Sequence, residues 1–243
     1  VGASVIIARY HGARDVQAMR RAEHTAMTMA LFMGVGVGIL GFALARPLLQ
    51  LMDSPPDVID GASLYVRIYF LGMPANMLYN FGAAILRAAG DTKSPLLYLT
   101  AAGIINVLLN LFFVIVLHMD VAGVALATIL SQTVSAVLVI RALMRRQDAC
   151  RLYWRQLRFH RTQLMKIIRI GLPAGIQNSL FSISNVLIQS SINSFSSVAM
   201  SGNAAAQNIE GFVYISMNAF HQTALNFTGQ NYGSAKFDRM AKI

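Results

Sequence analysis

Charged residues are scarce in this sequence. Only 12% of its 243 residues are Asp, Glu, Lys or Arg, while 56% are hydrophobic. A soluble domain typically carries about 25% charged residues. This shortage indicates that lipid, and not water, surrounds much of the folded chain.

Cysteine is nearly absent too. With Cys150 as its single cysteine, the chain can form neither an internal disulfide nor a cysteine-based metal site. The sequence also offers no nucleophile with a nearby base and no cluster of metal ligands, so we predict that it is not an enzyme and binds no cofactor or metal. The net charge of +10 would suit nucleic acid only if the basic residues shared one folded face. They fall instead in short runs between apolar stretches, so we expect no nucleic-acid partner.

The start of the chain shows no signal peptide, because no basic stretch is followed by a short apolar core and a cleavage site. The chain begins at Val1, within an apolar run that continues to Ala8. We interpret it as an internal piece of a longer protein.

Long apolar runs dominate what remains. A helix needs about 20 residues to cross a hydrocarbon layer of ~30 Å. Six stretches meet this need, and they predict an all-α, polytopic membrane bundle. The predicted spans are residues 25–45, 62–85, 95–117, 121–140, 170–200 and 204–229.

The basic residues alternate between loops as a multi-pass protein requires. Segments 9–24, 87–94, 141–169 and the tail after residue 229 hold 18 of the 20 Lys and Arg, and the intervening loops are almost free of them. The turns at 118–120 and 201–203 hold none. By the positive-inside rule, the basic loops should be cytoplasmic. Arg67, within the second span, is expected to extend toward the outer interface.

The connection 141–169 is the one long polar segment and the natural boundary between two bundles. Tyr153, Trp154 and Arg155 suit a short helix lying at the lipid headgroups. A weak repeat supports the division: residues 8–22 align with residues 229–243 at a spacing of 221, which pairs Gly12 with Gly233. Parallel six-span repeats are typical of transporters.

Polar side chains within the spans are candidate substrate-binding or ion-binding residues, since such groups face a cavity or another helix. In the fifth and sixth spans they line one helix face. The alternative is that these side chains only join neighbouring helices. The candidates are Glu210, Gln207, Tyr214, Asn218, His221, Asn178, Asn185, Gln189, Asn106, Asn110 and Gln132.

Glu210 is the acid placed deepest in the predicted spans, and His221 is a second titratable candidate. Gly36, Gly38 and Gly41 spell a literal GxGxxG, but no strand precedes it, which argues against a dinucleotide site. Gly34 and Gly38 instead predict a close helix contact.

Several ordered motifs resemble those of multidrug and toxic compound extrusion (MATE) transporters. The stretch LRAAGDTKSP at 86–95 resembles the loop between the fourth and fifth helices of that family. The other matching stretches are GMP at 72–74, INVLLN at 105–110, GVALAT at 123–128 with SQ at 131–132, RIGLPAG at 169–175 and GQNYG at 229–233.

The resemblance implies twelve helices in two six-helix lobes around a central cavity. Residues 1–140 would supply the end of helix 2 and helices 3–6, residues 141–169 the cytoplasmic linker, and residues 170–243 helices 7 and 8. The implied activity is export of small organic, cationic or drug-like molecules in exchange for H⁺ or Na⁺. The full-length protein would act as a monomer among the lipids of a plasma membrane, the bacterial inner membrane being expected.

Two departures from the family concern ion coupling. Many relatives carry Asp where this chain has Asn110, and many have an acid early in the seventh helix, where this chain has Phe181 and Ser182. Glu210 is the best remaining candidate for coupling. A lipid-linked oligosaccharide flippase is the alternative function, although the spans hold almost none of the cations that a pyrophosphate requires.

Overall fold

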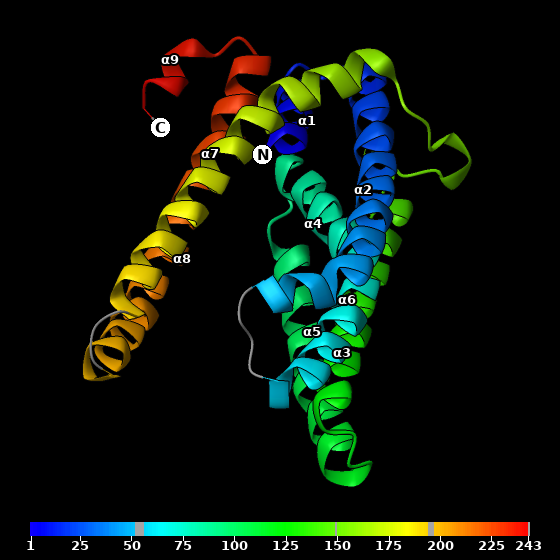
Figure 1. Cartoon of the computed structure of the whole chain (residues 1–243). Coiled ribbons are helices and arrows are strands. Elements are labelled where there is room, and N and C mark those ends of the chain that lie inside the picture. The colour runs from blue at the N-terminus through cyan, green and yellow to red at the C-terminus, as the bar shows by residue number, and fades with distance from the viewer. Residues whose placement is uncertain (52–55, 149, 194–196, 243) are drawn as a thin grey trace. The chain divides into compact units, whose positions relative to one another are not determined.

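The computed structural model describes residues 1–51, 56–148, 150–193 and 197–242, and every regular element in them is a helix (Figure 1). They are α1 (Gly2–Gly12), α2 (Val16–Leu51), α3 (Pro56–Leu71), α4 (Met73–Ala88), α5 (Lys93–Leu111), α6 (Asp120–Arg145), α7 (Arg161–Asn193), α8 (Ser197–Gly233) and α9 (Phe237–Met240). A π-helical turn, Phe112–Val116, extends α5, and a 3-10 turn, Trp154–Gln156, lies between α6 and α7. The all-α prediction is confirmed.

The chain divides into two compact units. Unit 1 contains Val1–Asp15 and Met165–Ile243, and unit 2 contains Val16–Leu164. The division falls inside the predicted linker, but packing groups Val1–Asp15 with α7 and α8. The assignment of residues 1–140 and 170–243 to two lobes stays a prediction.

Several helices extend beyond the predicted spans. At 1.5 Å per residue, the 36 residues of α2 exceed what the hydrocarbon layer needs. By length and composition, three helices among the described residues could cross a membrane: Val16–Gln50, Lys93–Val116 and Asp120–Arg145. The helices α3 and α4 have 16 residues each, and α7 and α8 are long but more polar.

The predicted second span, 62–85, is not one continuous helix. It divides at Gly72 into α3 and α4. Pro74 lies in the first turn of α4, and a proline both lacks the amide hydrogen that would continue α3 and clashes with the preceding turn. The division is therefore fixed by the Gly-Met-Pro sequence.

Two further predictions were wrong. The expected turn at 201–203 lies inside α8, because Gly and Asn each cost only about 1 kcal/mol or less in a helix whose neighbours, such as Ala204 to Ala206, favour it. The expected headgroup helix around Trp154 is a single 3-10 turn.

Unit 2 is held together by close helix contacts on glycines. A methyl group added at Gly34 would lie 2.6 Å from Pro74 Cα, and one at Gly38 would lie 2.9 Å from the Phe70 carbonyl oxygen. The same addition at Gly41 would overlap the Phe70 ring. This confirms the predicted contact at Gly34 and Gly38, and Gly38 and Gly41 of the GxGxxG string pack α2 against α3.

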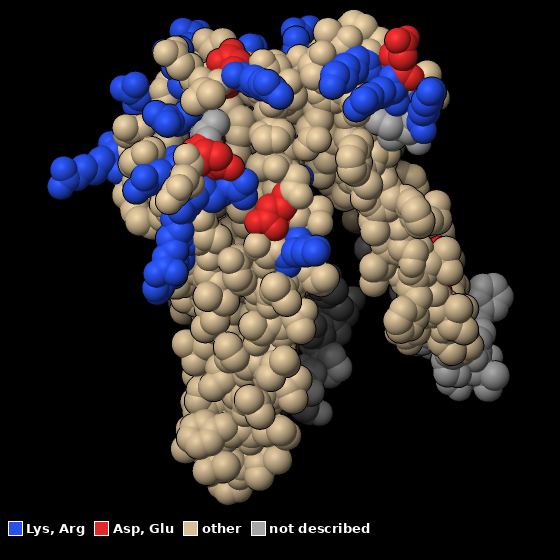
Figure 2. Space-filling model, turned by 180° about the vertical axis from the view of Figure 1, so that it is seen from behind, with Lys and Arg blue, Asp and Glu red and all other residues tan. Residues whose placement is uncertain are grey.

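The basic segments of unit 2 meet at one end. Arg146, after α6, lies 3.7 Å from Asp91 in the α4–α5 loop. The Tyr153 amide donates to His24 Nε2 near the start of α2, at 3.1 Å. Figure 2 shows that in each unit the Lys and Arg side chains gather near one end of the helices.

Candidate functional site

A chain of amide and hydroxyl groups joins α5 to α6. Asn110 Nδ2 donates to Asn106 Oδ1 at 3.1 Å, and Asn106 Nδ2 donates to Ser131 Oγ at 3.3 Å. Ser131 in turn donates to the Thr128 carbonyl oxygen at 2.9 Å. The structure thus brings together two predicted site residues, Asn106 and Asn110, which share a face because they are four residues apart.

One oxygen of this amide chain has no partner. Asn110 Oδ1 is buried and accepts no hydrogen bond from the described residues. Leaving a buried carbonyl oxygen without a hydrogen-bond partner costs free energy. This oxygen is therefore suited to accept a hydrogen bond from a ligand or to coordinate a cation. The π-helical turn begins two residues later, at Phe112, and such turns are frequent at functional sites.

Sequence reasoning missed Ser131 and selected its neighbour. Gln132 is half-buried, and its backbone carbonyl oxygen accepts a hydrogen bond from the Ser135 hydroxyl at 2.8 Å. Thr128, Ser131 and Ser135 follow i, i+3, i+7 spacing, the signature of one helix face. That spacing was the available signal, and it identifies Ser131 as the residue facing α5.

Most of the predicted residues of α7 and α8 lie on exposed surface of unit 1. Their contributions to a site stay predictions. Asn218 is half-buried, and the side chain of Gln189 lies outside the described part. The exposed candidates are Asn178, Asn185, Gln207, Glu210, Tyr214 and His221.

A buried polar contact joins α1 to α8. Ser4 Oγ donates to Asn226 Oδ1 at 2.5 Å, and both residues are buried. A methyl group at Gly12 would overlap the Gln230 carbonyl oxygen, and one at Gly233 would overlap the Arg9 carbonyl oxygen. The two helices therefore cross with their backbones almost touching.

The weak sequence repeat is a repeat of backbone geometry. Beyond α1, the amides of residues 13, 14 and 15 donate to the carbonyls of residues 9, 11 and 10; beyond α8, those of residues 234, 235 and 236 donate to residues 230, 232 and 231. Each pair is offset by 221. Arg14 and Ala235 share the left-handed conformation, with φ of 56° and 55°. The two crossing helix ends are thus structural copies.

A buried acid that the sequence did not single out lies near the start of α2. Glu23 has no exposed surface, and neither carboxyl oxygen has a hydrogen-bond partner among the described residues. Its surroundings include Arg20, Arg146, Asp148 and Cys150.

The segment after α6 covers this acid. The Arg146 guanidinium donates to both carboxylate oxygens of Asp148, at 3.0 and 2.6 Å, and this hydrogen bonding lowers the pKa of Asp148. Burial raises the pKa of the Cys150 thiol from its ordinary 9.0 to about 12. This thiol is therefore inert, as expected of a residue with a packing role.

Comparisons with known proteins give consistent matches. The family model MatE matches residues 1–112. The probable multidrug resistance protein YpnP of Bacillus subtilis (strain 168) is 28% identical over 94% of this chain and 51% of its own length. A protein of Shewanella oneidensis named as an FAD transporter is 23% identical over 98% of this chain and 54% of its own length.

Solved structures match the fold. A transporter of the MOP superfamily from Pyrococcus furiosus superimposes with a TM-score of 0.91 at 23% identity, covering 99% of this chain and 54% of that one. A crystal structure of MATE in the bent conformation gives 0.88 at 24% identity, covering 99% and 54%. The chain spans about half the length of the curated relatives it matches.

Proposed function

We propose that this chain is part of a transporter of the MATE family, whose members are transporters and not enzymes, and that the full-length protein is a secondary antiporter. It exports small organic compounds, cationic or drug-like, in exchange for H⁺ or Na⁺. The observation that carries this proposal is the match to proteins named for multidrug resistance along nearly the whole chain.

The polar groups on the described helices support such a role. The unpartnered oxygen of Asn110 and the exposed polar face of α8 offer acceptors for a cation or a proton donor. An ion that binds one cavity-facing state more tightly than the other shifts the equilibrium between them, which is how a gradient drives transport. Asn110 cannot release a proton, so Glu210 is our candidate for proton-dependent coupling.

The flippase alternative is less favoured. A pyrophosphate site requires several cations, and Arg67 is the one basic residue well within the predicted spans. Its guanidinium lies over the Phe42 ring, 5.5 Å from the ring centroid. A single arginine stacked on an aromatic ring is a poor match for a doubly charged phosphate group.

The proposed setting is a plasma membrane, the bacterial inner membrane, with the protein as a monomer and its basic loops cytoplasmic. The gathering of Lys and Arg at one end of each unit supports that orientation (Figure 2). The substrates and lipids would be its only partners.

Export is tested with the full-length gene in a drug-hypersensitive bacterium. We expect cells to accumulate less ethidium than cells with an empty vector, and accumulation to rise when an ionophore collapses the driving gradient. Replacing Na⁺ by K⁺ separates sodium from proton coupling. Equal ethidium accumulation with and without the protein, across a panel of cationic compounds, would contradict cation export, and faster flipping of a labelled lipid precursor would favour the flippase.

A further inference from the structure

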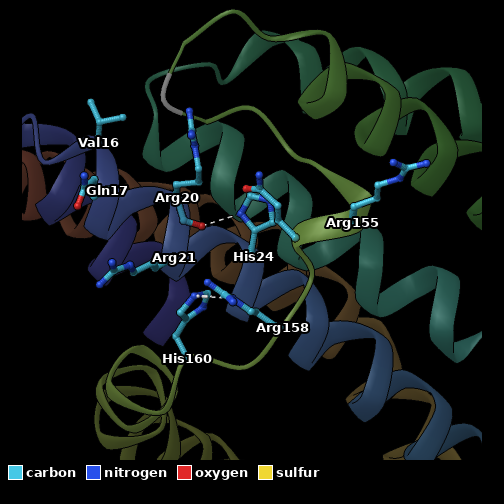
Figure 3. Close-up of a pocket in the computed structure, with 9 residues that line it drawn as sticks. Val16, Gln17, Arg20, Arg21, His24, Arg155, Arg158 and His160 are labelled. Atoms are coloured by element: carbon cyan, nitrogen blue, oxygen red, sulfur yellow. Dashed lines mark hydrogen bonds between the residues drawn. The ribbon is translucent and has the colours of Figure 1, made fainter.

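An open pocket of about 350 Å³ lies in unit 2, between the start of α2 and the segment that precedes α7. Its volume is within the roughly 300–1,000 Å³ typical of ligand sites. Figure 3 shows side chains from both segments around it. It is lined by Val16, Gln17, Arg20, Arg21, His24, Arg155, Gln156, Arg158 and His160.

Hydrogen bonds fix the two histidines of this pocket. His24 Nδ1 donates to the Arg20 carbonyl oxygen at 2.7 Å, and His24 Nε2 accepts the Tyr153 amide. His160 Nε2 accepts from Arg158 Nε at 3.1 Å, and His160 Nδ1 lies 3.3 Å from the Thr25 hydroxyl oxygen. The hydrogen bonds of both rings hold the segment 153–160 against α2.

The positive charge of the pocket therefore comes from arginines. Burial and the charges of Arg158 and Arg21 lower the pKa of His160, which disfavours the charged form of its ring. Arg20, Arg21, Arg155 and Arg158 make no ion pair with a carboxylate of the described residues. Four arginines thus line the pocket, and its lining residues include no Asp or Glu.

One of these arginines has a buried nitrogen without a hydrogen-bond acceptor in the described part of the chain. Arg20 Nε is buried and has no acceptor among the described residues, while its guanidinium carbon lies 5.6 Å from the centroid of the Tyr153 ring. A buried charged donor without a partner is strongly unfavourable. Arg20 nonetheless lines the pocket, and arginine is the residue best shaped to bind phosphate oxygens.

The location identifies the source of the anion. The pocket residues of α2 directly precede the predicted start of the first span, at Thr25. Two large side chains next in sequence to pocket residues, Trp154 and Phe159, are 48% and 44% exposed. Aromatic residues of this kind are enriched where lipid headgroups meet hydrocarbon, so a lipid phosphate is at the right depth.

We propose that this pocket binds the phosphate of an anionic phospholipid headgroup. The lipid would bridge α2 to the segment after α6 through the arginines of both. This inference does not depend on which compound the protein exports.

The test measures binding of short-chain phosphatidylglycerol to the full-length protein in a neutral detergent. Short-chain phosphatidylcholine and inorganic phosphate are the comparison ligands. The pocket variant is Arg155→Gln with Arg158→Gln, because both side chains belong to the segment outside the helices. The matched control is Arg141→Gln with Arg145→Gln, which removes the same charge from exposed positions on α6.

We expect the pocket variant to weaken phosphatidylglycerol binding by roughly tenfold or more, and the control pair by less than about twofold. Phosphatidylcholine should bind much more weakly to the unmodified protein. If inorganic phosphate binds as tightly as phosphatidylglycerol, the source is free phosphate and the lipid assignment is wrong. Equal losses in the pocket and control variants would overturn the site altogether, since a diffuse surface charge would then explain binding.

Discussion

The candidate coupling residues differ in chemistry. Asn106, Asn110 and Ser131 form one hydrogen-bonded group, in which Asn110 Oδ1 accepts no hydrogen bond from the described residues. Glu210 lies exposed on α8. The first set provides neutral acceptors and the second a carboxyl group, so their proposed contributions to ion binding differ.

Glu210 is the residue whose replacement tests coupling. Gln keeps the size and polarity of Glu210 but cannot bind or release a proton, so Glu210→Gln should abolish most ion-driven efflux of ethidium from cells. Glu210→Asp keeps the carboxyl group and should retain a measurable part of it. Protein level in the membrane is compared for both variants. If Glu210→Gln leaves ion-driven efflux unchanged, the coupling role is wrong.

Cys150 should be slow to react in the folded protein. A thiol reacts as its thiolate, and a pKa of about 12 in place of the ordinary 9.0 leaves roughly a thousandfold less thiolate at pH 8. We expect maleimide to label Cys150 at least that much more slowly in mild detergent than after denaturation in SDS, with any other cysteines of the full-length protein replaced. Rapid labelling of the folded protein would show that the segment after α6 does not cover the thiol.

At the scale of elements, close contacts at glycine fix how the helices pack. The contact of α2 with the α3–α4 junction involves Gly34, whereas Gly36 faces open space with nothing within 4 Å of an added methyl group. The two positions lie two residues apart on the same helix, so they provide a matched comparison.

We predict that Gly34→Ala destabilises the protein and Gly36→Ala does not. The Gly34 methyl group would lie 2.6 Å from backbone at Pro74, and overpacking of this kind costs about 1–3 kcal/mol. At Gly36 the gain in helix propensity, up to about 1 kcal/mol, should leave stability unchanged or raised. The melting temperature of the full-length protein in detergent, followed by size-exclusion chromatography after heating, measures both. Equal melting temperatures would contradict the packing of α2.

The sequence predicted which segments are helical better than where each helix begins and ends. Hydropathy located α2, α5 and α6, because their apolar runs exceed the length of a span. It could not show that α7 begins at Arg161 or that α8 begins at Ser197, because polar turns outside the lipid carry no hydropathy signal. The only sequence signal for the break between α3 and α4 at Gly72 is the Gly-Met-Pro motif.

The candidate site was predictable in part for a related reason. Spacing of four residues brought Asn106 and Asn110 to one face, and the structure bonds them to each other. To choose Ser131 over Gln132, one must know which face of α6 is turned toward α5. That orientation depends on how the two helices pack. The pocket at the start of α2 was not predictable from the sequence. Residues 20–25 and 153–160 are far apart in the chain and come together only when it folds.

For the whole molecule, the distribution of charge predicts how the chain is oriented. In unit 2, the start of α2, the α4–α5 loop and the segment after α6 meet, and all three are basic. The exposed ion pair between Arg46 of α2 and Asp60 of α3, at 3.1 Å, lies in the region 46–60, which the alternation of charge assigns to the opposite side. An orientation follows that can be measured directly.

We predict that Arg145 and Asp60 lie on opposite faces of the membrane. Single cysteines placed by Arg145→Cys and Asp60→Cys, in the full-length protein without other cysteines, should react differently with a thiol reagent that cannot cross the membrane. In intact cells with a permeable outer membrane, Asp60→Cys should label and Arg145→Cys should not. Both should label once the inner membrane is disrupted, which controls for access. Because both positions are exposed and an exposed ion pair contributes only about 0–1 kcal/mol, neither change should disturb folding. Labelling of both positions in intact cells would place them on one side of the bilayer, and a basic end facing outward would contradict the positive-inside rule on which the proposed lipid site also depends.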